Sequence, residues 1–276
     1  MLRLVLVSLL WAFSFGLIKG RLAGLDSAFI SAARLCLALL VFLPFLRFKG
    51  VTRRTAGVLT GIGAVQFGLM YLAYNESFRY LPAYQVALFT ITTPILVTLL
   101  ADALDRTFRP RALGAALLAV LGTAIVVYQS PGGTLQGFLL VQLSNAAFAI
   151  GQVLYRRVRQ RPGLPAECAS FAWLYLGGFV VALTAFLASG VQSITLTGSQ
   201  LLTLLYLGGI ASGLGFFLWN KGATQVNAGT LAVMNNAKVP LAVACSLAFF
   251  GESADVPRLL VSLGLLGAAV WLAEKR

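Results

Sequence analysis

The chain has 276 residues, of which 59% are hydrophobic and only 11% are charged, and its mean hydropathy is +0.89. Soluble domains carry about 25% charged residues, so this composition excludes a water-soluble fold and indicates an integral membrane protein. The net charge of +13 would suit nucleic-acid binding, but membrane topology explains how the basic residues are distributed, so no nucleic-acid partner is expected.

Ten apolar runs are long enough to cross a hydrocarbon core of about 30 Å, which takes about 20 helical residues. In chain order they cover residues 2–18, 28–46, 56–75, 82–101, 112–129, 135–155, 167–188, 199–219, 227–250 and 257–273. The first run has the basic start of a signal peptide but no convincing cleavage site, so we assign it as the first membrane helix. The sequence therefore predicts an all-α integral membrane protein with ten transmembrane helices.

The loops between these runs differ sharply in charge. Fifteen of the 21 Lys and Arg residues fall at the two ends of the chain and in the even-numbered loops, four fall in the other loops, and Arg34 and Lys238 lie inside spans. Cytoplasmic loops of membrane proteins are enriched in Lys and Arg. We therefore predict a multi-pass protein of the bacterial inner (plasma) membrane with both termini in the cytoplasm.

The second half of the chain repeats the first. Residues 68–75 (GLMYLAYN) return as residues 213–220 (GLGFFLWN), an offset of 145, and residues 117–127 resemble residues 262–272. Units with an odd number of spans insert in opposite orientations, and loop charge agrees: the basic loop at 47–54 corresponds to a loop at 189–200 without Lys or Arg. The sequence predicts two inverted five-helix repeats, residues 1–130 and 131–276, around a central cavity, as in alternating-access transporters.

Several kinds of chemistry are disfavoured. The chain has no histidine, and its eight acidic residues fall in loops or near span ends, so coupling through an intramembrane carboxylate is not expected. No nucleophile–base pair or carboxylate pair shares one membrane depth, which argues against an enzyme. Cys36, Cys168 and Cys245 lack paired spacing, so neither a metal site nor a cofactor is predicted.

Lys238 lies near the middle of the ninth span, where an ionised lysine costs about 2.5–3.5 kcal/mol on insertion scales. Asn235 is three residues earlier on the same helical face. We predict that this pair faces the substrate path and receives a carboxylate; a lysine bonded to carbonyls of a neighbouring helix is the alternative. Arg34 lies closer to the outer surface, which favours anchoring at the membrane interface.

The sixth span carries one polar or small stripe. Its members are Gln142, Asn145, Ala149 and Gln152. We predict that Asn145 and Gln152 belong to the cavity wall, although hydrogen bonding between helices would also explain amides at these positions.

Aromatic and proline residues complete the candidate site. Trp11, Tyr71, Tyr74 and Trp219 are predicted substrate contacts, with packing or interface anchoring as the alternative. Pro94 and Pro240 lie in the equivalent fourth and ninth spans and are predicted to kink them, which makes both candidate hinges. The small pairs Ala64/Gly68 and Gly209/Gly213 are expected to let helices approach closely.

Two stretches resemble a known family. Residues 10–15 (LWAFSF), Lys19 and residues 33–35 (ARL) resemble the opening of EamA-type members of the drug/metabolite transporter superfamily. Residues 218–222 (LWNKG) and 230–233 (TLAV), with Pro240 and residues 250–252 (FGE), resemble the second EamA repeat. The nearest resemblance is to YddG-type exporters of aromatic and other neutral amino acids. One position departs from the family pattern: Ala101-Asp102 stands where Gly-Glu is expected.

The resemblance implies ten helices around a central cavity, with the fifth and tenth helices peripheral, and export from the cytoplasm. We therefore predict a transporter that exports small amphipathic metabolites, most plausibly neutral or aromatic amino acids. A multidrug or nucleobase exporter on the same scaffold is one alternative, and a non-transporting membrane sensor or scaffold is another. The expected partners are an amino-acid-like substrate and membrane lipid; a homodimer is compatible with the sequence but not required by it.

Overall fold

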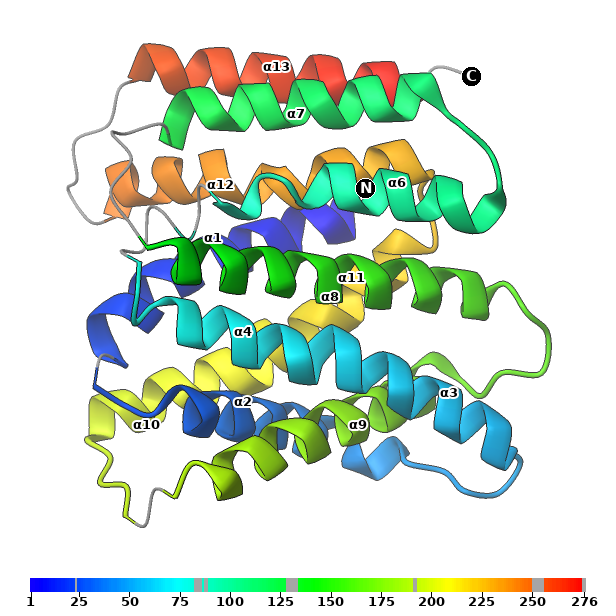
Figure 1. Ribbon diagram of the computed structural model, residues 1–276, viewed down its shortest axis with the longest axis vertical. Coiled ribbons are helices and arrows are strands. Elements are labelled where there is room, and N and C mark those ends of the chain that lie inside the picture. Colours follow the sequence, from blue (N-terminus) through cyan, green and yellow to red (C-terminus); the bar gives the residue numbers. More distant parts are fainter. Residues whose placement is uncertain are drawn as a thin grey trace.

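A computed structural model describes residues 1–22, 24–81, 86, 89–127, 134–190, 193–249 and 256–274, and every regular element in these ranges is helical (Figure 1). The first half contains α1 (Leu2–Arg21), α2 (Ser27–Phe42), η1 (Leu43–Phe45), α3 (Arg53–Gly63), η2 (Ala64–Leu69), α4 (Met70–Ser77), α6 (Thr93–Asp105) and α7 (Pro110–Val127). The second half contains α8 (Leu135–Arg159), α9 (Glu167–Ala188), α10 (Gly198–Leu205), η3 (Tyr206–Leu214), α11 (Gly215–Ala223), α12 (Ala228–Phe249) and α13 (Val256–Glu274). The family motif at residues 250–252 and the side chain of Cys245 lie outside the described residues.

Polar side chains begin several of these helices. The Asp26 carboxylate accepts a hydrogen bond from the Phe29 backbone N–H at 2.8 Å, which satisfies one of the free donors at the start of α2. Thr197 and Gln200 form a reciprocal capping box at the start of α10. Such caps define the residue at which each helix begins, which hydropathy alone does not locate.

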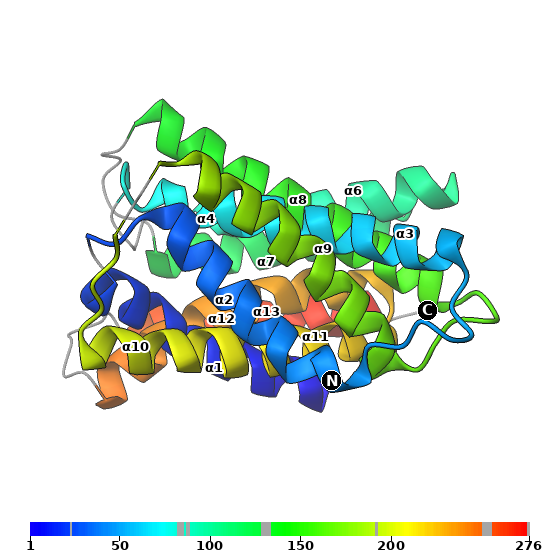
Figure 2. The same cartoon turned by 90° about the horizontal axis from the view of Figure 1, so that it is seen from below.

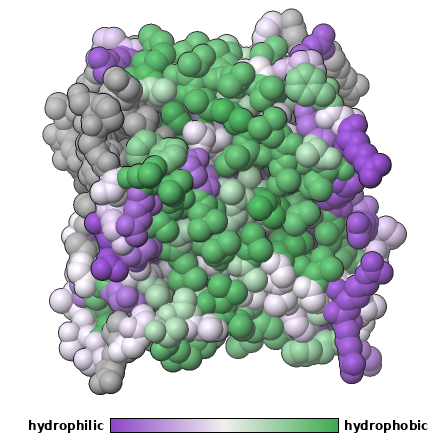
Figure 3. Space-filling view, in the orientation of Figure 1, coloured by the Kyte–Doolittle hydropathy of each residue, from purple (hydrophilic) through white to green (hydrophobic). Residues whose placement is uncertain are grey.

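The described helices suit a membrane. Five segments are long and apolar enough to cross one, namely Ser27–Phe45, Arg53–Ser77, Leu135–Arg159, Glu167–Ala188 and Gly198–Ala223. Exposed large side chains on the outside include Leu121, Leu139 and Val180. Figure 3 shows hydrophobic residues over most of one face, with hydrophilic residues gathered toward its edges. Such a surface fits contact with lipid in the middle and with water at the ends.

Helices α7 and α13 pack against each other at one edge of the molecule (Figure 1), on the far side of α12 and α6 from α2, α9 and α10. Figure 2, turned by 90°, shows α4 and α8 on one side of the molecule and α1 and α12 on the other. These helices, rather than the α7–α13 pair, therefore face the interior of the molecule.

Two segments are π-helical, and they fall at equivalent positions of the repeat. η2 spans Ala64–Leu69, and the offset of 145 residues carries it onto the second part of η3, Tyr206–Leu214. A π-helix displaces the backbone hydrogen bonds by one residue and leaves carbonyls available to side chains. In η3 the Trp11 indole donates to the Ala211 carbonyl, and the Tyr175 hydroxyl contacts the carbonyls of Ser212 and Gly213. Neighbouring helices thus satisfy the carbonyls that the π geometry frees.

The fourth span differs from the prediction. Residues 82–85 and 87–88 lie outside the described residues, and α6 begins at Thr93, so Pro94 occupies the first turn of a helix. A proline in the first turn removes no intrahelical hydrogen bond, so Pro94 does not kink α6 from within, and its role as a hinge stays a prediction. Pro240 does lie inside α12, and its role as a hinge stays a prediction.

Glycine brings α3 and α9 into close contact. A Cβ atom on Gly63 would overlap the backbone of Leu174, and one on Gly177 would overlap the backbone of Thr60. Gly68 also packs closely, against Val181 and the Gly178 carbonyl. Gly209 does not, since its nearest neighbour would be 4.0 Å from an added Cβ. The small-residue prediction therefore identified one close approach correctly but missed the close approaches at Gly63 and at Gly177.

Replacing Gly177 with alanine is expected to lower the thermal unfolding midpoint in detergent, because the added methyl group must displace backbone; overpacking of this kind costs about 1–3 kcal/mol. Gly57→Ala in α3 is the matched control, since nothing lies within 4 Å of its added Cβ. The control is expected to unfold at or slightly above the wild-type temperature, because alanine is the better helix former. Equal midpoints for the two variants would contradict the close packing of α3 on α9.

Candidate functional site

A cavity of about 90 Å³, lined by helices from both halves of the chain, lies in the interior of the molecule. Six of the helices contribute to it: α1, α2, α4, α8, α11 and α12, together with the start of α6. Its lining consists of Trp11, Ser14, Ile18, Arg34, Met70, Tyr71, Tyr74, Thr90, Thr93, Ser144, Asn145, Phe148, Phe216 and Lys238. This lining contains two cations and no acidic residue among the described side chains.

Lys238 reaches the cavity from the middle of α12. Its Nζ atom lies 5.6 Å from the centre of the Trp11 ring, a distance at which the ring face attracts a cation. Trp11 is itself fixed by the hydrogen bond of its indole N–H to the Ala211 carbonyl, at 2.9 Å. Among the residues that the structure describes, no carboxylate pairs with Lys238. Its half-buried ammonium group therefore remains available to an anion.

Arg34 does not lie at the membrane interface, so the anchoring prediction is wrong. Its side chain is 3% exposed and lines the cavity. The Nε atom donates to Ser212 Oγ at 3.2 Å, and Nη2 donates to the Tyr71 hydroxyl at 2.9 Å. The guanidinium also lies 4.2 Å from the centre of the Tyr71 ring. The third nitrogen, Nη1, is enclosed and has no hydrogen-bond partner in the described part of the chain.

Aromatic rings connect the two cations. Phe216 lies 4.8 Å from Trp11 and 5.9 Å from Tyr71, measured between ring centres. Phe148 closes one side of this row, at 6.3 Å from Trp11 and 5.9 Å from Phe216. The cavity therefore offers an apolar surface with a positive charge at each end.

The structure brings together five of the eight predicted substrate contacts: Lys238, Asn145, Trp11, Tyr71 and Tyr74. The other three, Asn235, Gln152 and Trp219, do not line the cavity. Trp219 is fully buried and packs 4.9 Å from Trp11, behind the wall.

The amide side chains of α8 mostly bond to other helices. Asn145 Nδ2 donates to the Phe89 carbonyl at 2.9 Å, and Gln142 Nε2 donates to the same carbonyl at 3.0 Å. Gln152 accepts from Asn235 Nδ2 at 3.5 Å, and both side chains are buried. Hydrogen bonding between helices, the alternative reading of this stripe, therefore explains Gln142 and Gln152. Asn145 both bonds to Phe89 and faces the cavity.

A layer of paired, buried amides lies beyond one end of the cavity. Gln66 and Asn220 exchange hydrogen bonds of 3.1 and 3.3 Å, and both are fully buried. Gln66 precedes the cavity residue Tyr71 in the chain and Asn220 follows Phe216, so both lie toward the end where α3 begins and α11 ends. The Gln152–Asn235 pair lies toward the same end, where α8 finishes and α12 starts.

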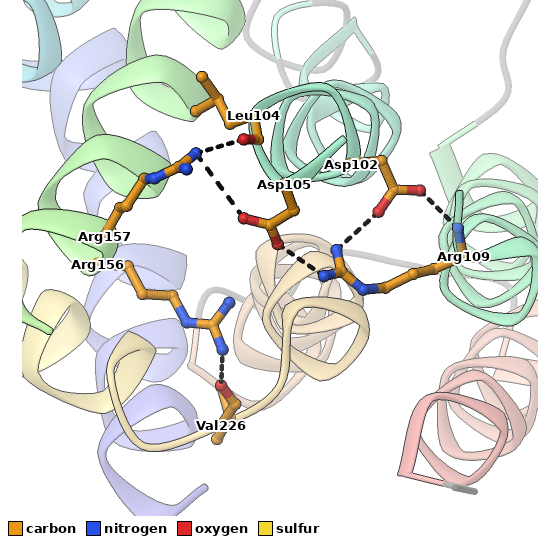
Figure 4. Close-up of polar contacts among 7 residues, drawn as sticks. All are labelled: Asp102, Leu104, Asp105, Arg109, Arg156, Arg157 and Val226. Carbon is orange, nitrogen blue, oxygen red and sulfur yellow. Dashed lines mark hydrogen bonds and ion pairs between the residues drawn. The ribbon is translucent and has the colours of Figure 1, made fainter. Parts of the chain in front are cut away.

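Beyond this layer, an ionic cluster joins the ends of four helices (Figure 4). Its members are Asp102, Leu104, Asp105, Arg109, Arg156, Arg157 and Val226. Figure 4 shows Arg109 and Arg157 approaching Asp105 from opposite sides, at 2.6 and 3.8 Å. Arg156 donates to the Val226 carbonyl ahead of α12. Exposed ion pairs contribute about 0–1 kcal/mol each, so this cluster sets the relative position of the helix ends more than it stabilises the fold.

The signal that could have identified Arg34 was already in the sequence. A charged residue inside an apolar span is a candidate functional residue by default, whatever its distance from the surface. The remaining missed lining residues are small polar residues, such as Ser144 and Thr93, and large apolar ones, such as Ile18 and Phe216, whose positions indicate nothing without the fold. In the part of the chain that the structure describes, no group of three or more His, Cys, Asp or Glu could hold a metal ion.

Comparison with known proteins finds relatives along nearly the whole chain. The model of the EamA-like transporter family matches residues 1–128 and 135–273. A probable biotin transporter of Pseudomonas aeruginosa is 46% identical, over 98% of this chain and 96% of the relative. A biotin transporter of Escherichia coli is 42% identical, over 99% of this chain and 92% of the relative. A probable amino-acid metabolite efflux pump of Salmonella typhimurium is only 23% identical, over 98% and 91%.

A solved crystal structure shares the fold with a TM-score of 0.75 at 19% identity, over 98% of this chain and 94% of that one. At that identity the likeness concerns the fold alone.

These relatives overturn the prediction of amino-acid export, because the full-length relatives that are 41–46% identical are named for biotin. The alternatives of a multidrug or nucleobase exporter fit them no better. A non-transporting sensor or scaffold and an enzyme are both excluded, since the relatives are named transporters. The match of both halves to one family model bears out the resemblance seen in the sequence. The chain is a membrane transporter of a small molecule, and it belongs to the EamA-like transporter family.

Proposed function

We propose that this protein transports biotin across the membrane. The observation that carries the proposal is the identity of 41–46% to biotin transporters over nearly the whole chain. Relatives this similar share the cavity-forming helices from end to end, since the alignments cover 98–99% of this chain.

The charge of the cavity supports this substrate over an amino acid. Biotin carries one carboxylate and no ammonium group, so two cations without an acidic neighbour suit it. An amino acid would bring an ammonium group toward Arg34 and Lys238, with no carboxylate in the described lining to receive it. Lipophilic cations would be repelled in the same way.

Lys238 is the proposed partner of the biotin carboxylate. It is a half-buried point charge with three donors, and no described carboxylate competes for it. Trp11, Tyr71 and Tyr74 offer apolar faces to the ring system, and Asn145 offers a polar edge. In this proposal Asn235, Gln152 and Trp219 support the wall from behind.

Many alternating-access transporters are built from two oppositely oriented units. The proposed arrangement has ten spans in two inverted repeats, residues 1–130 and 131–276, in the inner membrane with both termini in the cytoplasm. The equivalent π-helical segments η2 and η3 and the distribution of the basic loops support it. The amide layer of Gln66 and Asn220 also lies toward the basic end, so in this proposal it closes the cavity toward the cytoplasm.

Purified protein in liposomes is expected to exchange labelled for unlabelled biotin, whereas tryptophan does not compete. Lys238→Gln is expected to lower biotin exchange by about tenfold or more, because a hydrogen bond between charged groups contributes about 1.5–3 kcal/mol and about 1.4 kcal/mol corresponds to a factor of ten. Lys49→Gln, in an exposed loop, is the matched control and is expected to behave like the wild type. Absence of biotin exchange by the folded wild type would refute the proposed substrate.

Gln66→Ala is expected to loosen the closed end of the cavity, because the buried Asn220 amide then loses its partner. The reporter is Ser144→Cys in a variant whose three native cysteines are replaced by alanine. In sealed vesicles, labelling of this cysteine from the cytoplasmic side should rise several-fold, about the effect of losing one hydrogen bond of 0.5–1.5 kcal/mol. Gln160→Ala, an exposed amide, is the control. Unchanged labelling in Gln66→Ala would show that the amide layer is not the gate.

A further inference from the structure

We infer that Arg34 recognises the uncharged end of the substrate, the carbonyl oxygen of the cyclic urea of biotin, while Lys238 takes the carboxylate. This inference rests on the proposed function and makes Arg34 a specificity-determining residue. It follows from where the two cations lie and from how many donors of Arg34 are already occupied.

The two cations stand at opposite ends of one row of rings. Lys238 lies over Trp11 at 5.6 Å, and Arg34 lies over Tyr71 at 4.2 Å. Phe216 lies between these two rings, at 4.8 Å from Trp11 and 5.9 Å from Tyr71. A substrate that lies along the row therefore meets a different cation at each end. Biotin has this shape, with a fused ring head, an aliphatic tail and polar groups at both extremes.

The hydroxyl groups beside Arg34 have no proton left for a ligand. Ser212 Oγ donates its single proton to the Leu207 carbonyl, five residues back in η3, at 2.6 Å. It must then accept from Tyr71, whose oxygen lies 2.7 Å away, and from Arg34 Nε. Tyr71 in turn accepts from Arg34 Nη2 at 2.9 Å. The hydroxyl proton of Tyr71 and that of Ser212 are thereby assigned. This series of hydrogen bonds ends at the Leu207 carbonyl of η3.

One nitrogen of Arg34 is therefore left over. Nε and Nη2 are bonded to hydroxyl groups, and Nη1 is enclosed without a partner. A guanidinium binds a carboxylate best with two parallel N–H groups, and the Nε–Nη2 edge is already occupied here. The N–H groups that remain, on Nη1 and on the far side of Nη2, can both donate to one carbonyl oxygen, which has two lone pairs. Lys238 differs, because its ammonium group makes no hydrogen bond to another described residue and can meet a full negative charge.

Iminobiotin tests this assignment, since it keeps the carboxylate but replaces the urea oxygen with a group that is cationic at neutral pH. The wild type should exchange biotin at least about tenfold better than iminobiotin, because like charges in contact repel strongly within a protein. Arg34→Gln removes the repulsion and should reduce this preference several-fold. Using the ratio of two substrates on one sample cancels differences in the amount of folded protein.

Two further variants distinguish the carboxylate end of the site from the urea end. Lys238→Gln should lower exchange of both compounds while leaving their ratio near the wild-type value. The same variant should lose the preference for biotin over biotinamide, which lacks the negative charge. Arg54→Gln, at an exposed cation in the first turn of α3, should change neither ratio.

The outcomes are distinct. If the wild type exchanges biotin but Arg34→Gln alters both substrates by one factor, Arg34 is structural and the inference fails while the proposed function stands. If Arg34→Gln does not fold, Arg34→Lys replaces it: this variant keeps the charge and should still reject iminobiotin, and equal exchange of both compounds would overturn the assignment. A wild type that exchanges no biotin refutes the proposed function itself.

Discussion

The buried guanidinium of Arg34 is the constraint on which the centre of this molecule depends. A cation held inside an apolar bundle needs hydrogen-bond partners, and Arg34 finds them in Tyr71 of α4 and Ser212 of η3. α2 must therefore lie between these two elements, one from each half of the chain. Ser212 meets this demand because the π geometry of η3 allows it to bond five residues back to Leu207. The local irregularity and the central charge thus depend on each other.

The same irregularity organises the other wall of the cavity. Carbonyl groups freed in η3 accept from Trp11 of α1 and lie against the hydroxyl of Tyr175 of α9. Trp11 is then held in place to lie beneath Lys238. A change in the backbone of η3 would therefore shift the bonding partners of both Arg34 and Trp11, and Lys238 lies over the ring of Trp11. In a transporter this coupling would let the substrate's charge and the helix geometry influence each other.

The sequence predicted the features that composition and periodicity determine. The predictions failed where the role of a side chain depends on its hydrogen-bond partner in another helix. The helical spans followed from the apolar runs, and Lys238 and Asn145 followed from the polar residues within those runs. Gln152 and Asn235 were assigned to the cavity because spacing shows a shared face, but it cannot show that the two amides bond each other across helices. The substrate was wrong for a different reason. Lys238 was expected to receive a carboxylate, which an amino acid and biotin both carry. The absence of mid-span carboxylates, which also argues against a ligand with an ammonium group, was applied only to proton coupling.

The amide layer beside the cavity differs from the ionic cluster beyond it for a physical reason. A buried ion pair left without its partner is strongly destabilising, by about 3–5 kcal/mol, so a gate built from one would resist opening. A neutral hydrogen bond contributes only about 0.5–1.5 kcal/mol net, because water can replace it. The layer nearest the cavity consists of amides, Gln66 with Asn220 and Gln152 with Asn235, whereas the ion pairs of Asp105 lie at the exposed helix ends. In the proposed transport cycle, the strong charges would remain where the substrate can compensate them, and the contacts that break would be the weak ones.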